Sequence, residues 1–415
     1  MTAAILSIGT ELTRGELVNT NASWLAERLT WLGFEVREHV TVDDHVGRIV
    51  SALDRLAGEH RVIVATGGLG PTTDDLTTES AASALGVKLE RHEPSVDTIR
   101  RRFAALGREM SPSNLKQADF PEGATVLPNA AGTAPGFAIT LHTARVFFMP
   151  GVPSEMMRIF ADHVQPVIAP LAERTSAQIR LRCFGLPESV IGERLAGLED
   201  EEPKLTIGYR ASFPEIEVKV LVHGTSESEA EATAMRYASK VRERLGDAVY
   251  GEGQDTYPAY VGRALHDRGL TMAVAESCTG GMIGEMITRV PGSSEYLLFD
   301  AVTYSNVAKQ ELLGVDPELM RHYGAVSSEV ARAMAEGALR RSHADLAVAV
   351  TGIAGPGGGT EAKPVGTVFF ALAQKDAETV EVMQKLFGDR ERIRSLASYI
   401  ALKLVADAAT ARGRV

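Results

Sequence analysis

Two serines, a tyrosine and a lysine stand close together in the second half of this sequence: Ser277, Ser294, Tyr304 and Lys309. A lysine whose pKa is lowered by burial can take a proton from a serine hydroxyl, and a tyrosine can orient or relay that proton. Such a group hydrolyses amides or esters without a metal or a histidine. These residue types therefore indicate a hydrolase.

The surrounding pattern predicts how these side chains are positioned. The apolar run 271–275 is typical of a buried strand, and a helix is expected after Gly281. Ser277, Thr279 and Gly280 then lie at a strand-to-helix turn, where free backbone N–H groups can hold an anion. A second Gly-rich loop begins at Thr351 and Gly352 and permits close backbone approach to a ligand. N–H groups of these turns could form an oxyanion hole.

Each of these residues also has an ordinary structural interpretation. Ser277 and Thr279 could cap the helix, and Ser294 could only shape a turn. Lys309 could be a solvated surface charge. The joint occurrence of all the pieces favours a site. The residues leave open which serine attacks; Ser294, in a loop ten residues before Tyr304, is slightly preferred over Ser277.

A second candidate site follows the predicted strand 62–65. Its glycines let the backbone approach a phosphate, while threonine and paired aspartates supply hard oxygen ligands for Mg²⁺ or a similar ion. The residues concerned are Gly67, Gly68, Gly70, Thr72, Asp74 and Asp75. Asp74 could instead begin a helix. Three more loops, 9–12, 129–136 and 149–156, are expected beside this one and complete a pocket for an anionic ligand.

Composition limits the remaining possibilities. The chain has 415 residues, of which 45% are hydrophobic and 23% charged, which is typical of a soluble protein with two or three domains. A formal net charge of -11 argues against broad binding to nucleic acid or anionic membranes. Two cysteines without a CxxC motif exclude a disulfide scaffold and fit a reducing cytoplasm. Neither a signal peptide nor a membrane span is expected.

The order of elements predicts an α/β fold of two three-layer α/β domains joined by a small α+β module. Alternating strands and helices over 1–168 and 251–415 predict parallel sheets wrapped by helices, with ligands at the carboxyl ends of the strands. The segment 169–250 alternates like half-exposed strands and is interpreted as a spacer or packing module. Residues 251–255 are expected to form a linker.

The motifs of the last part carry a family resemblance. The strings AESCTGG, PGSS, VTYSNVAK, HYGAVSS, TGIAGPGGG and GDRERIR resemble the C-terminal domain of the CinA family, which is similar to nicotinamide mononucleotide (NMN) deamidases. The resemblance implies an amidohydrolase of the CinA type that converts NMN into nicotinic acid mononucleotide and ammonia, without a cofactor.

Motif by motif, the resemblance implies roles for individual residues. Ser277, Ser294, Tyr304 and Lys309 fall on the catalytic constellation. Thr279, Gly280, Thr351, Gly352 and Arg390 fall on substrate-binding positions. Arg390 suits a 5′-phosphate because its planar fork can bind two oxygens. The neighbouring Arg392 and Arg394 could instead be surface charges of a helix.

The first part resembles the molybdopterin-binding (MoaB/MogA-like) fold in the version fused to CinA. GTELTRGELVNTN and TGGLGPTTDDLT carry this resemblance. It implies a metal-dependent ADP-ribose pyrophosphatase with Gly67, Gly68, Gly70 and Thr72 at the substrate and with Asp74 and Asp75 holding Mg²⁺ or a similar divalent ion. Molybdopterin binding is the competing inheritance of this fold. The middle module resembles the small domain of the same family, whose role is not settled.

Together these features predict a cytoplasmic enzyme of pyridine-nucleotide salvage that acts on NMN and ADP-ribose. A homodimer is the default expectation, with no direct nucleic-acid and no membrane partner. The alternative is a molybdopterin- or nucleotide-binding sensor or adaptor protein linked to competence and DNA damage.

Overall fold

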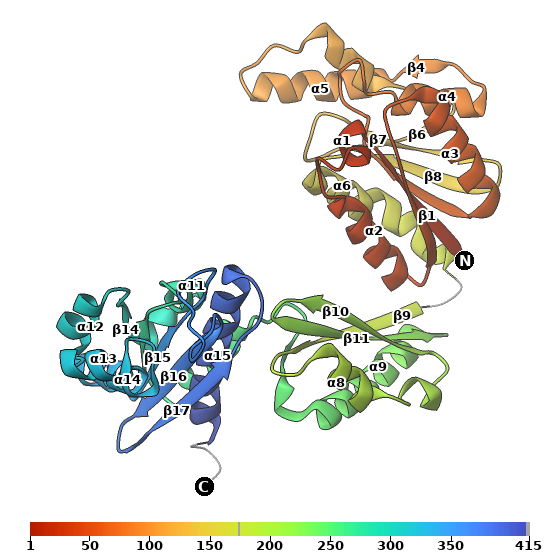
Figure 1. The fold of residues 1–415 in the computed structure, drawn as a ribbon. Coiled ribbons are helices and arrows are strands. Elements are labelled where there is room, and N and C mark those ends of the chain that lie inside the picture. Colours follow the sequence, from red (N-terminus) through yellow and green to blue (C-terminus); the bar gives the residue numbers. More distant parts are fainter. Residues whose placement is uncertain (173–174, 412–415) are drawn as a thin grey trace. The chain divides into compact units, whose positions relative to one another are not determined.

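The structure is a computed structural model that describes residues 1–172 and 175–411. It consists of two α/β domains joined in sequence by a small α+β module (Figure 1). Each has its own sheet, and each is described by itself below.

The N-terminal domain is built on a six-stranded sheet of order β2-β1-β3-β8-β7-β6. The first four strands in this order are parallel, as expected, but β7 runs antiparallel to both of its neighbours, β8 and β6. Two residues separate β7 from β8, so only a hairpin can join them. The strands are β1 (Thr2–Ile8), β2 (Glu35–Val42), β3 (Val62–Thr66), β6 (Thr125–Leu127), β7 (Gly136–Leu141) and β8 (Ala144–Met149).

Helices cover both faces of this sheet. The amphipathic helix α3 (Val46–Glu59) and α4 (Thr77–Leu85) pack on one apolar face, while α2 (Thr20–Trp31) and α6 (Pro153–Ile159) pack on the other. This makes three layers. The remaining elements are α1 (Thr10–Thr13), β4 (Leu89–Arg91), α5 (Glu93–Ala105), a 3₁₀ helix (Pro112–Ala118), β5 (Asp119–Pro121), a π-helical turn (Phe160–Val164), α7 (Gln165–Ile168) and a 3₁₀ turn (Ala169–Leu171).

The small module contains a four-stranded sheet of order β10-β11-β9-β12 with two helices. The linker expected at 251–255 is partly wrong, because Gly251 and Glu252 pair with β9 as the end of an antiparallel strand. The elements are β9 (Thr175–Cys183), α8 (Glu188–Leu195), a 3₁₀ turn (Glu199–Glu201), β10 (Leu205–Ser212), β11 (Glu215–Gly224), α9 (Glu227–Leu245), a 3₁₀ turn (Gly246–Ala248) and β12 (Val249–Glu252).

The C-terminal domain has a five-stranded sheet of order β14-β13-β15-β16-β17. β13 (Met272–Glu276) lies between β14 (Leu297–Val302) and β15 (Leu346–Gly352) and is parallel to both. The antiparallel hairpin of β16 (Thr367–Gln374) and β17 (Ala377–Lys385) completes the sheet, which is therefore only partly parallel.

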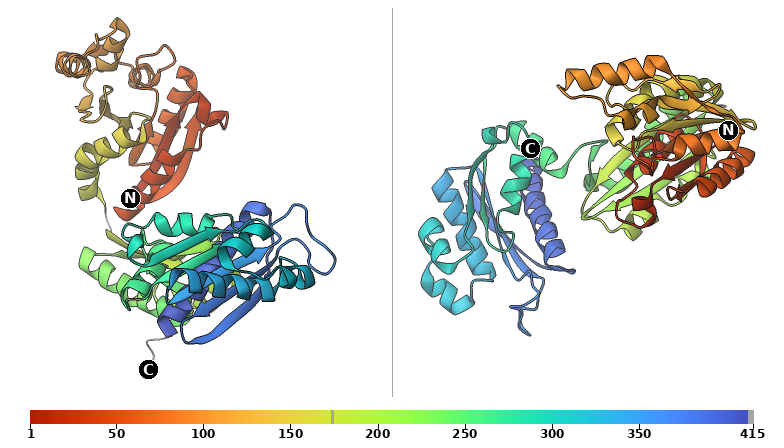
Figure 2. Two further views of the ribbon diagram at one scale, coloured as in Figure 1. Left: turned by 90° about the vertical axis from the view of Figure 1, so that its left-hand side faces the viewer. Right: turned by 90° about the horizontal axis from the view of Figure 1, so that it is seen from above.

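The residues of β13 alternate between two cores. Met272 and Val274 face α10 (Tyr257–His266), α11 (Met282–Thr288) and α15 (Arg390–Ala411). Ala273 and Ala275 face the other core, where small alanines allow close packing by helices of the opposite layer. That layer contains α12 (Asn306–Leu313), α13 (Pro317–Tyr323) and α14 (Ser328–Ser342); a 3₁₀ turn covers Ser293–Glu295. Figure 2 shows the helices on both faces of this sheet.

Within residues 1–172 and 175–411, none of the helices combines the length and the apolar character needed to cross a lipid bilayer.

Candidate functional site

The loop that carries Ser277 is built at the end of the central strand β13. The Ser277 N–H donates to the carbonyl of Val350 at 3.0 Å, which extends the sheet by one residue. Gly280 and Gly281 then turn the chain with φ angles of 62° and 92°, a region that L side chains rarely occupy. Helix α11 follows at once, so the predicted strand-to-helix turn is confirmed.

The side chain of Glu276, a residue that the sequence analysis did not identify, holds this turn in place. Its carboxylate is fully buried and accepts the N–H groups of Gly281 and Gly284, each at 2.9 Å. A carboxylate at the start of a helix is stabilised by the helix dipole and by these donors. Glu276 therefore takes the capping role that was considered for Ser277 and Thr279. An acidic residue ending an otherwise apolar strand was the available signal.

Two of the backbone N–H groups that could have formed an oxyanion hole at this turn, those of Gly280 and Gly281, are already used. Gly281 donates to Glu276, and Gly280 donates to the Ser277 carbonyl at 3.2 Å. The Thr279 hydroxyl is different: it is buried and has no hydrogen-bond partner among the described residues. Buried polar atoms nearly always have a partner. Thr279 is therefore suited to meet a bound ligand or water.

Lys309 points at Ser277. Its Nζ donates to the Ser277 Oγ at 3.0 Å and to the Thr303 carbonyl at 2.7 Å, and the residue is 1% exposed. Helix α12 holds it in place, and Ser305 caps that helix by accepting the Ala308 N–H at 3.1 Å. The interpretation of Lys309 as a solvated surface charge is wrong.

Burial lowers the pKa of Lys309, while interaction with Cys278 opposes this shift. Among the residues that the structure describes, no carboxylate lies within ion-pairing distance of its Nζ. The lysine thus has a raised share of neutral amine near pH 7. Burial raises the pKa of Cys278 to about 12, so the thiol next to Ser277 stays protonated and is a poor nucleophile.

Arginines from the first turns of α15 close another side of the site. Arg390 donates to the Gly355 carbonyl at 2.7 Å and to the Tyr304 hydroxyl at 3.0 Å. Arg394 donates to the Thr279 carbonyl at 2.7 and 3.2 Å. The interpretation of Arg394 as a mere surface charge is therefore wrong. Its spacing of four residues from Arg390 was the signal that both belong to one side of the helix.

Thr351 and Gly352, which were expected to begin the Gly-rich loop, are instead the last two residues of β15, and the loop follows them. The Thr351 hydroxyl donates to the Ala325 carbonyl at 2.8 Å and is buried. At Gly352 a Cβ atom would lie only 2.8 Å from the Val368 side chain. Both residues pair with β16, Thr351 opposite Phe369 and Gly352 opposite Val368, so they fix the point at which the Gly-rich loop leaves the sheet.

Ser294 and Tyr304 are not joined to the lysine. Ser294 lies in an exposed 3₁₀ turn, and in the described part of the chain its hydroxyl makes no hydrogen bond to Lys309 or Ser277. Tyr304 is 61% exposed and is linked to the site through Arg390. The contacts therefore favour Ser277, not the slightly preferred Ser294, as the serine that Lys309 can activate.

The second candidate site is a cavity of about 630 Å³ at the carboxyl ends of β1, β3 and β8. The four loops that were expected to converge all contribute to it. The lining includes Gly9, Gly67, Gly68, Gly70, Asp74, Asp75, Thr133, Gly151 and Glu155. At Gly67, with a φ of 105°, a Cβ atom would overlap the Ile8 carbonyl, so only glycine fits.

The loop 70–75 is shaped by Thr72 and Asp75. The Asp75 carboxylate accepts the Thr72 N–H at 2.8 Å and also its hydroxyl, while Lys116 donates to the Thr72 carbonyl at 3.2 Å. Asp74 is exposed and lies in a turn before α4, so it does not begin that helix. The nearby Thr72 side chain lowers the pKa of Asp74, so this exposed carboxylate stays ionised.

The charged side chains among the described residues that line this cavity are all acidic. Its lining carries the carboxylates of Glu11, Asp44, Asp74, Asp75 and Glu155 and, among the described lining residues, neither lysine nor arginine. Several are already committed: Asp44 accepts the Thr10 N–H and hydroxyl, and Glu155 accepts the Asn129 amide at 2.6 Å. Such hard oxygen donors fit Mg²⁺, which typically uses one or two carboxylates plus ligand phosphates.

Three family models match the chain in succession. The probable molybdopterin binding domain matches residues 4–170, the damage-inducible protein CinA KH domain residues 178–251, and the CinA C-terminal domain residues 254–409.

Full-length relatives agree with these matches. The chain is 46% identical to a CinA-like protein of Geobacter sulfurreducens over 407 residues, which cover 97% of this chain and 98% of that protein. It is 44% identical to a CinA-like protein of Anaeromyxobacter sp. strain Fw109-5 over 404 residues, 97% of either chain. A solved structure of a competence/damage inducible protein from Agrobacterium tumefaciens is 40% identical and covers 38% of this chain and 97% of that chain, with a TM-score of 0.36.

Proposed function

Because the chain belongs to the CinA-like protein family, we propose that its C-terminal domain hydrolyses the carboxamide of NMN to nicotinic acid mononucleotide and ammonia. The observation that supports this best is the 3.0 Å contact between Lys309 Nζ and Ser277 Oγ, in a buried position without a described counter-charge. A neutral lysine beside a serine is a recognised arrangement for amide hydrolysis.

In the first half-reaction, neutral Lys309 takes the Ser277 proton while Oγ attacks the carboxamide carbon. The tetrahedral adduct collapses when the lysine ammonium returns that proton to the leaving nitrogen, so ammonia departs and an ester remains on Ser277. Water then attacks the ester while Lys309 accepts a proton from it. The lysine ammonium returns this proton to the leaving Ser277 Oγ, so the serine hydroxyl is regenerated and nicotinic acid mononucleotide is released. Lysine alternates between base and acid in the same place.

The surrounding residues bind and orient the substrate in this proposal. The unpartnered Thr279 hydroxyl is available to the carboxamide or to the charge that develops on its oxygen. Arg390 and Arg394 bring two guanidinium groups to the rim, where a 5′-phosphate can be held. Tyr304, which receives a hydrogen bond from Arg390, belongs to this rim and not to proton transfer.

We further propose a metal-dependent ADP-ribose pyrophosphatase activity for the N-terminal domain. The supporting observation is the acidic lining of the 630 Å³ cavity. A diphosphate is repelled by these carboxylates unless a divalent cation accompanies it. Asp74, whose lowered pKa keeps it charged, and Asp75 are the residues that would hold the ion, which supplies charge neutralisation of the diphosphate.

A second candidate function follows from the family model for residues 4–170, which is named for molybdopterin binding. In that case the N-terminal cavity would bind a pterin phosphate or a nucleotide without cleaving it, and the chain would act as a sensor or adaptor. A cytoplasmic location and a homodimer remain part of the enzymatic proposal.

One experiment separates these proposals. The purified chain is incubated with NMN and with ADP-ribose in separate reactions, each with Mg²⁺ or with EDTA, and the products are identified by mass spectrometry. We expect nicotinic acid mononucleotide in both NMN reactions. AMP and ribose 5-phosphate should form only where Mg²⁺ is present. Binding of either compound without a product would support the sensor instead.

A further inference from the structure

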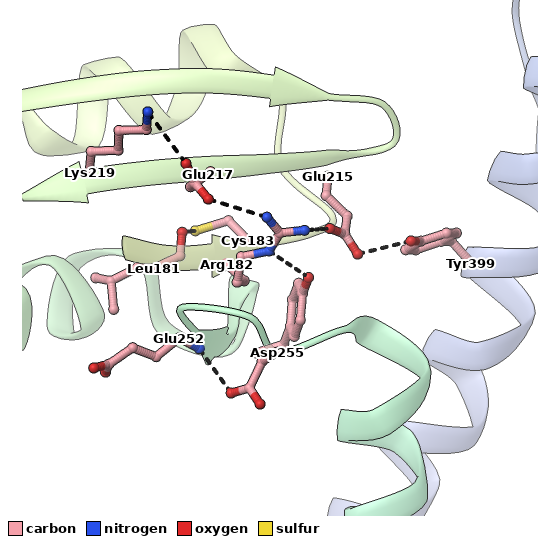
Figure 3. A network of polar contacts seen from close by, with 10 residues as sticks. Leu181, Arg182, Cys183, Glu215, Glu217, Lys219, Glu252, Asp255 and Tyr399 are labelled. Atoms are coloured by element: carbon pink, nitrogen blue, oxygen red, sulfur yellow. Dashed lines mark hydrogen bonds and ion pairs between the residues drawn. The ribbon is translucent and has the colours of Figure 1, made fainter. Parts of the chain in front are cut away.

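The small module meets helix α15 along one narrow face of that helix. The Tyr399 hydroxyl donates to the Glu215 carboxylate of β11 at 2.9 Å (Figure 3). Seven residues earlier, the Arg392 guanidinium lies 5.0 Å from the centre of the Phe213 ring, in the turn between β10 and β11. Residues seven apart lie on nearly the same side of a helix. The β10–β11 turn and the start of β11 therefore contact α15 at two points, Arg392 and Tyr399.

Other residues of the small module hold Glu215 in place. Glu215 also pairs with Arg182 of β9, which in turn contacts Glu217 at 3.3 Å (Figure 3). Arg182 also donates to the Tyr250 hydroxyl at 3.3 Å. The carboxylates of Glu215 and Glu217 are almost completely buried. A buried carboxylate with several fixed donors has little freedom to move, so Glu215 presents a rigid acceptor to Tyr399.

Aromatic packing supports the same contact. Tyr399 stacks on Tyr257 with ring centres 5.5 Å apart and packs against Phe184 of the small module at 5.1 Å. Burial raises the pKa of Tyr399, so its hydroxyl remains a protonated donor. Packing therefore fixes the position of the Tyr399 ring, and the hydrogen bond of its hydroxyl fixes the ring's orientation.

The opposite side of the same helix serves the site. Arg390 and Arg394, four residues apart, share a side of α15 that is turned away from Arg392 and Tyr399. These two arginines reach the Tyr304 hydroxyl, the Gly355 carbonyl and the Thr279 carbonyl. One rigid helix thus has the small module on one side and the proposed substrate rim on the other.

We infer that the small module is the positioning element of the amidase site: Phe213 and Glu215 hold the outer side of α15 and thereby fix Arg390 and Arg394 at the rim. This inference rests on the proposed deamidase function. Phe213, Glu215 and Tyr399 are positioning residues, since they touch neither Ser277 nor Lys309. Their loss loosens binding of the phosphate-bearing substrate and leaves the serine–lysine chemistry in place.

The test uses the full-length protein with Tyr399→Phe, Phe213→Ala and the combination. Tyr399→Phe removes the hydroxyl and keeps the stacked ring. Tyr209→Phe, which removes the hydroxyl of a half-exposed tyrosine on β10, is the matched control for Tyr399→Phe. Phe213→Tyr, which keeps an aromatic ring beside Arg392, is the control for Phe213→Ala. Two quantities are measured: kcat and KM for NMN, and amide hydrogen exchange over residues 390–396.

For the double variant we expect KM to rise roughly three- to tenfold, the range for coupling through packed elements, with kcat changed less than about twofold. Exchange over 390–396 should become faster. The control and Phe213→Tyr should match the unmodified protein in both. An unchanged KM, or a loss confined to kcat, would overturn the inference. If the unmodified protein does not deamidate NMN, the proposed function fails, whereas unchanged exchange over 390–396 overturns the positioning role by itself.

Discussion

Lys309 Nζ lies 3.0 Å from Ser277 Oγ although the two residues stand on different elements, one on α12 and the other after β13. The parallel pairing of β13 with β14 creates this contact, because the segment that follows β14 returns to the end of β13. The Thr303 N–H donates to the Glu276 carbonyl at 2.7 Å and continues that pairing to the start of α12. The sheet itself therefore brings the proposed base and the proposed nucleophile together.

The two candidate serines should differ sharply when each is replaced by alanine. Ser277→Ala removes the group that Lys309 contacts and should lower kcat for NMN by roughly 10⁴- to 10⁶-fold. Substrate binding, followed by calorimetry, should be largely retained. Ser294→Ala removes an exposed hydroxyl and should change kcat by less than about tenfold. Near-normal turnover in both variants would exclude a serine mechanism.

How much of this was predictable depends on the kind of contact. The strand-to-helix turn at Ser277 and the Gly-rich loops are local features, and their motifs predicted them correctly. The choice between Ser277 and Ser294 depends on where α12 packs, which no local pattern contains. Glu276 was missed although an acidic residue at the end of an apolar strand was a signal, because the two amide groups that its carboxylate accepts are identified only in the structure.

The sheets show the same limit. Strand–helix alternation correctly predicted the parallel strands around β1 and β13, since their connections contain helices. The antiparallel strands of these two sheets are joined by connections without a helix, such as the two residues between β16 and β17. For Arg394, the spacing from Arg390 indicated a shared side of the helix, but only the fold shows that the Thr279 carbonyl lies beside it.

The pH dependence of deamidation should follow Lys309. Burial lowers the pKa of this amine from its ordinary 10.5. Because the neutral form is the base, kcat/KM for NMN should rise with pH and level off above the lowered pKa. Lys309→Met should lower kcat by roughly 10²- to 10⁴-fold, as for loss of a general base. A kcat/KM that falls between pH 6 and 8 would contradict this assignment.

The same lysine should make the protein less stable than it could be. A lowered pKa means that the folded state binds fewer protons than the unfolded state, so the free energy of unfolding rises with pH between the folded pKa of Lys309 and 10.5. Lys309→Met removes this dependence and should raise Tm at pH 7. The Tm of both proteins, measured from pH 6 to 9, checks the sign. If the Lys309→Met variant has the lower Tm at every pH, the buried amine does not reduce the stability of the fold.

Asp300 should produce the opposite dependence on pH. Its carboxylate lies so close to α11 that a Cβ on Gly284 would overlap it, and burial together with the charge of Glu276 raises the pKa of Asp300 to about 7. A raised pKa stabilises the fold at low pH, and this contribution is lost as pH rises through about 7. Between pH 5 and 8, the Tm of the unmodified protein should fall relative to the Tm of the Asp300→Asn variant. Parallel curves would refute the shift.

Metal removal should separate the two activities. EDTA should abolish ADP-ribose cleavage and leave NMN deamidation unchanged, because we propose a cation only for the N-terminal cavity with its carboxylates. Asp74→Asn should reduce ADP-ribose cleavage on the order of 10²-fold, as expected when one ligand of a catalytic ion is lost. Asp97→Asn, an exposed aspartate on α5 outside the cavity lining, is the control. Equal loss in both variants would contradict a specific role for Asp74.

The central claim, that Lys309 activates Ser277 for attack on the carboxamide, is tested most directly by trapping the ester. The unmodified protein is mixed with NMN in the presence of EDTA, quenched in acid within one turnover, and digested for mass spectrometry. We predict an acyl adduct on the peptide that contains Ser277, and none when Lys309→Met is treated in the same way. An adduct on Ser294, or one that forms equally without the lysine, would contradict the account.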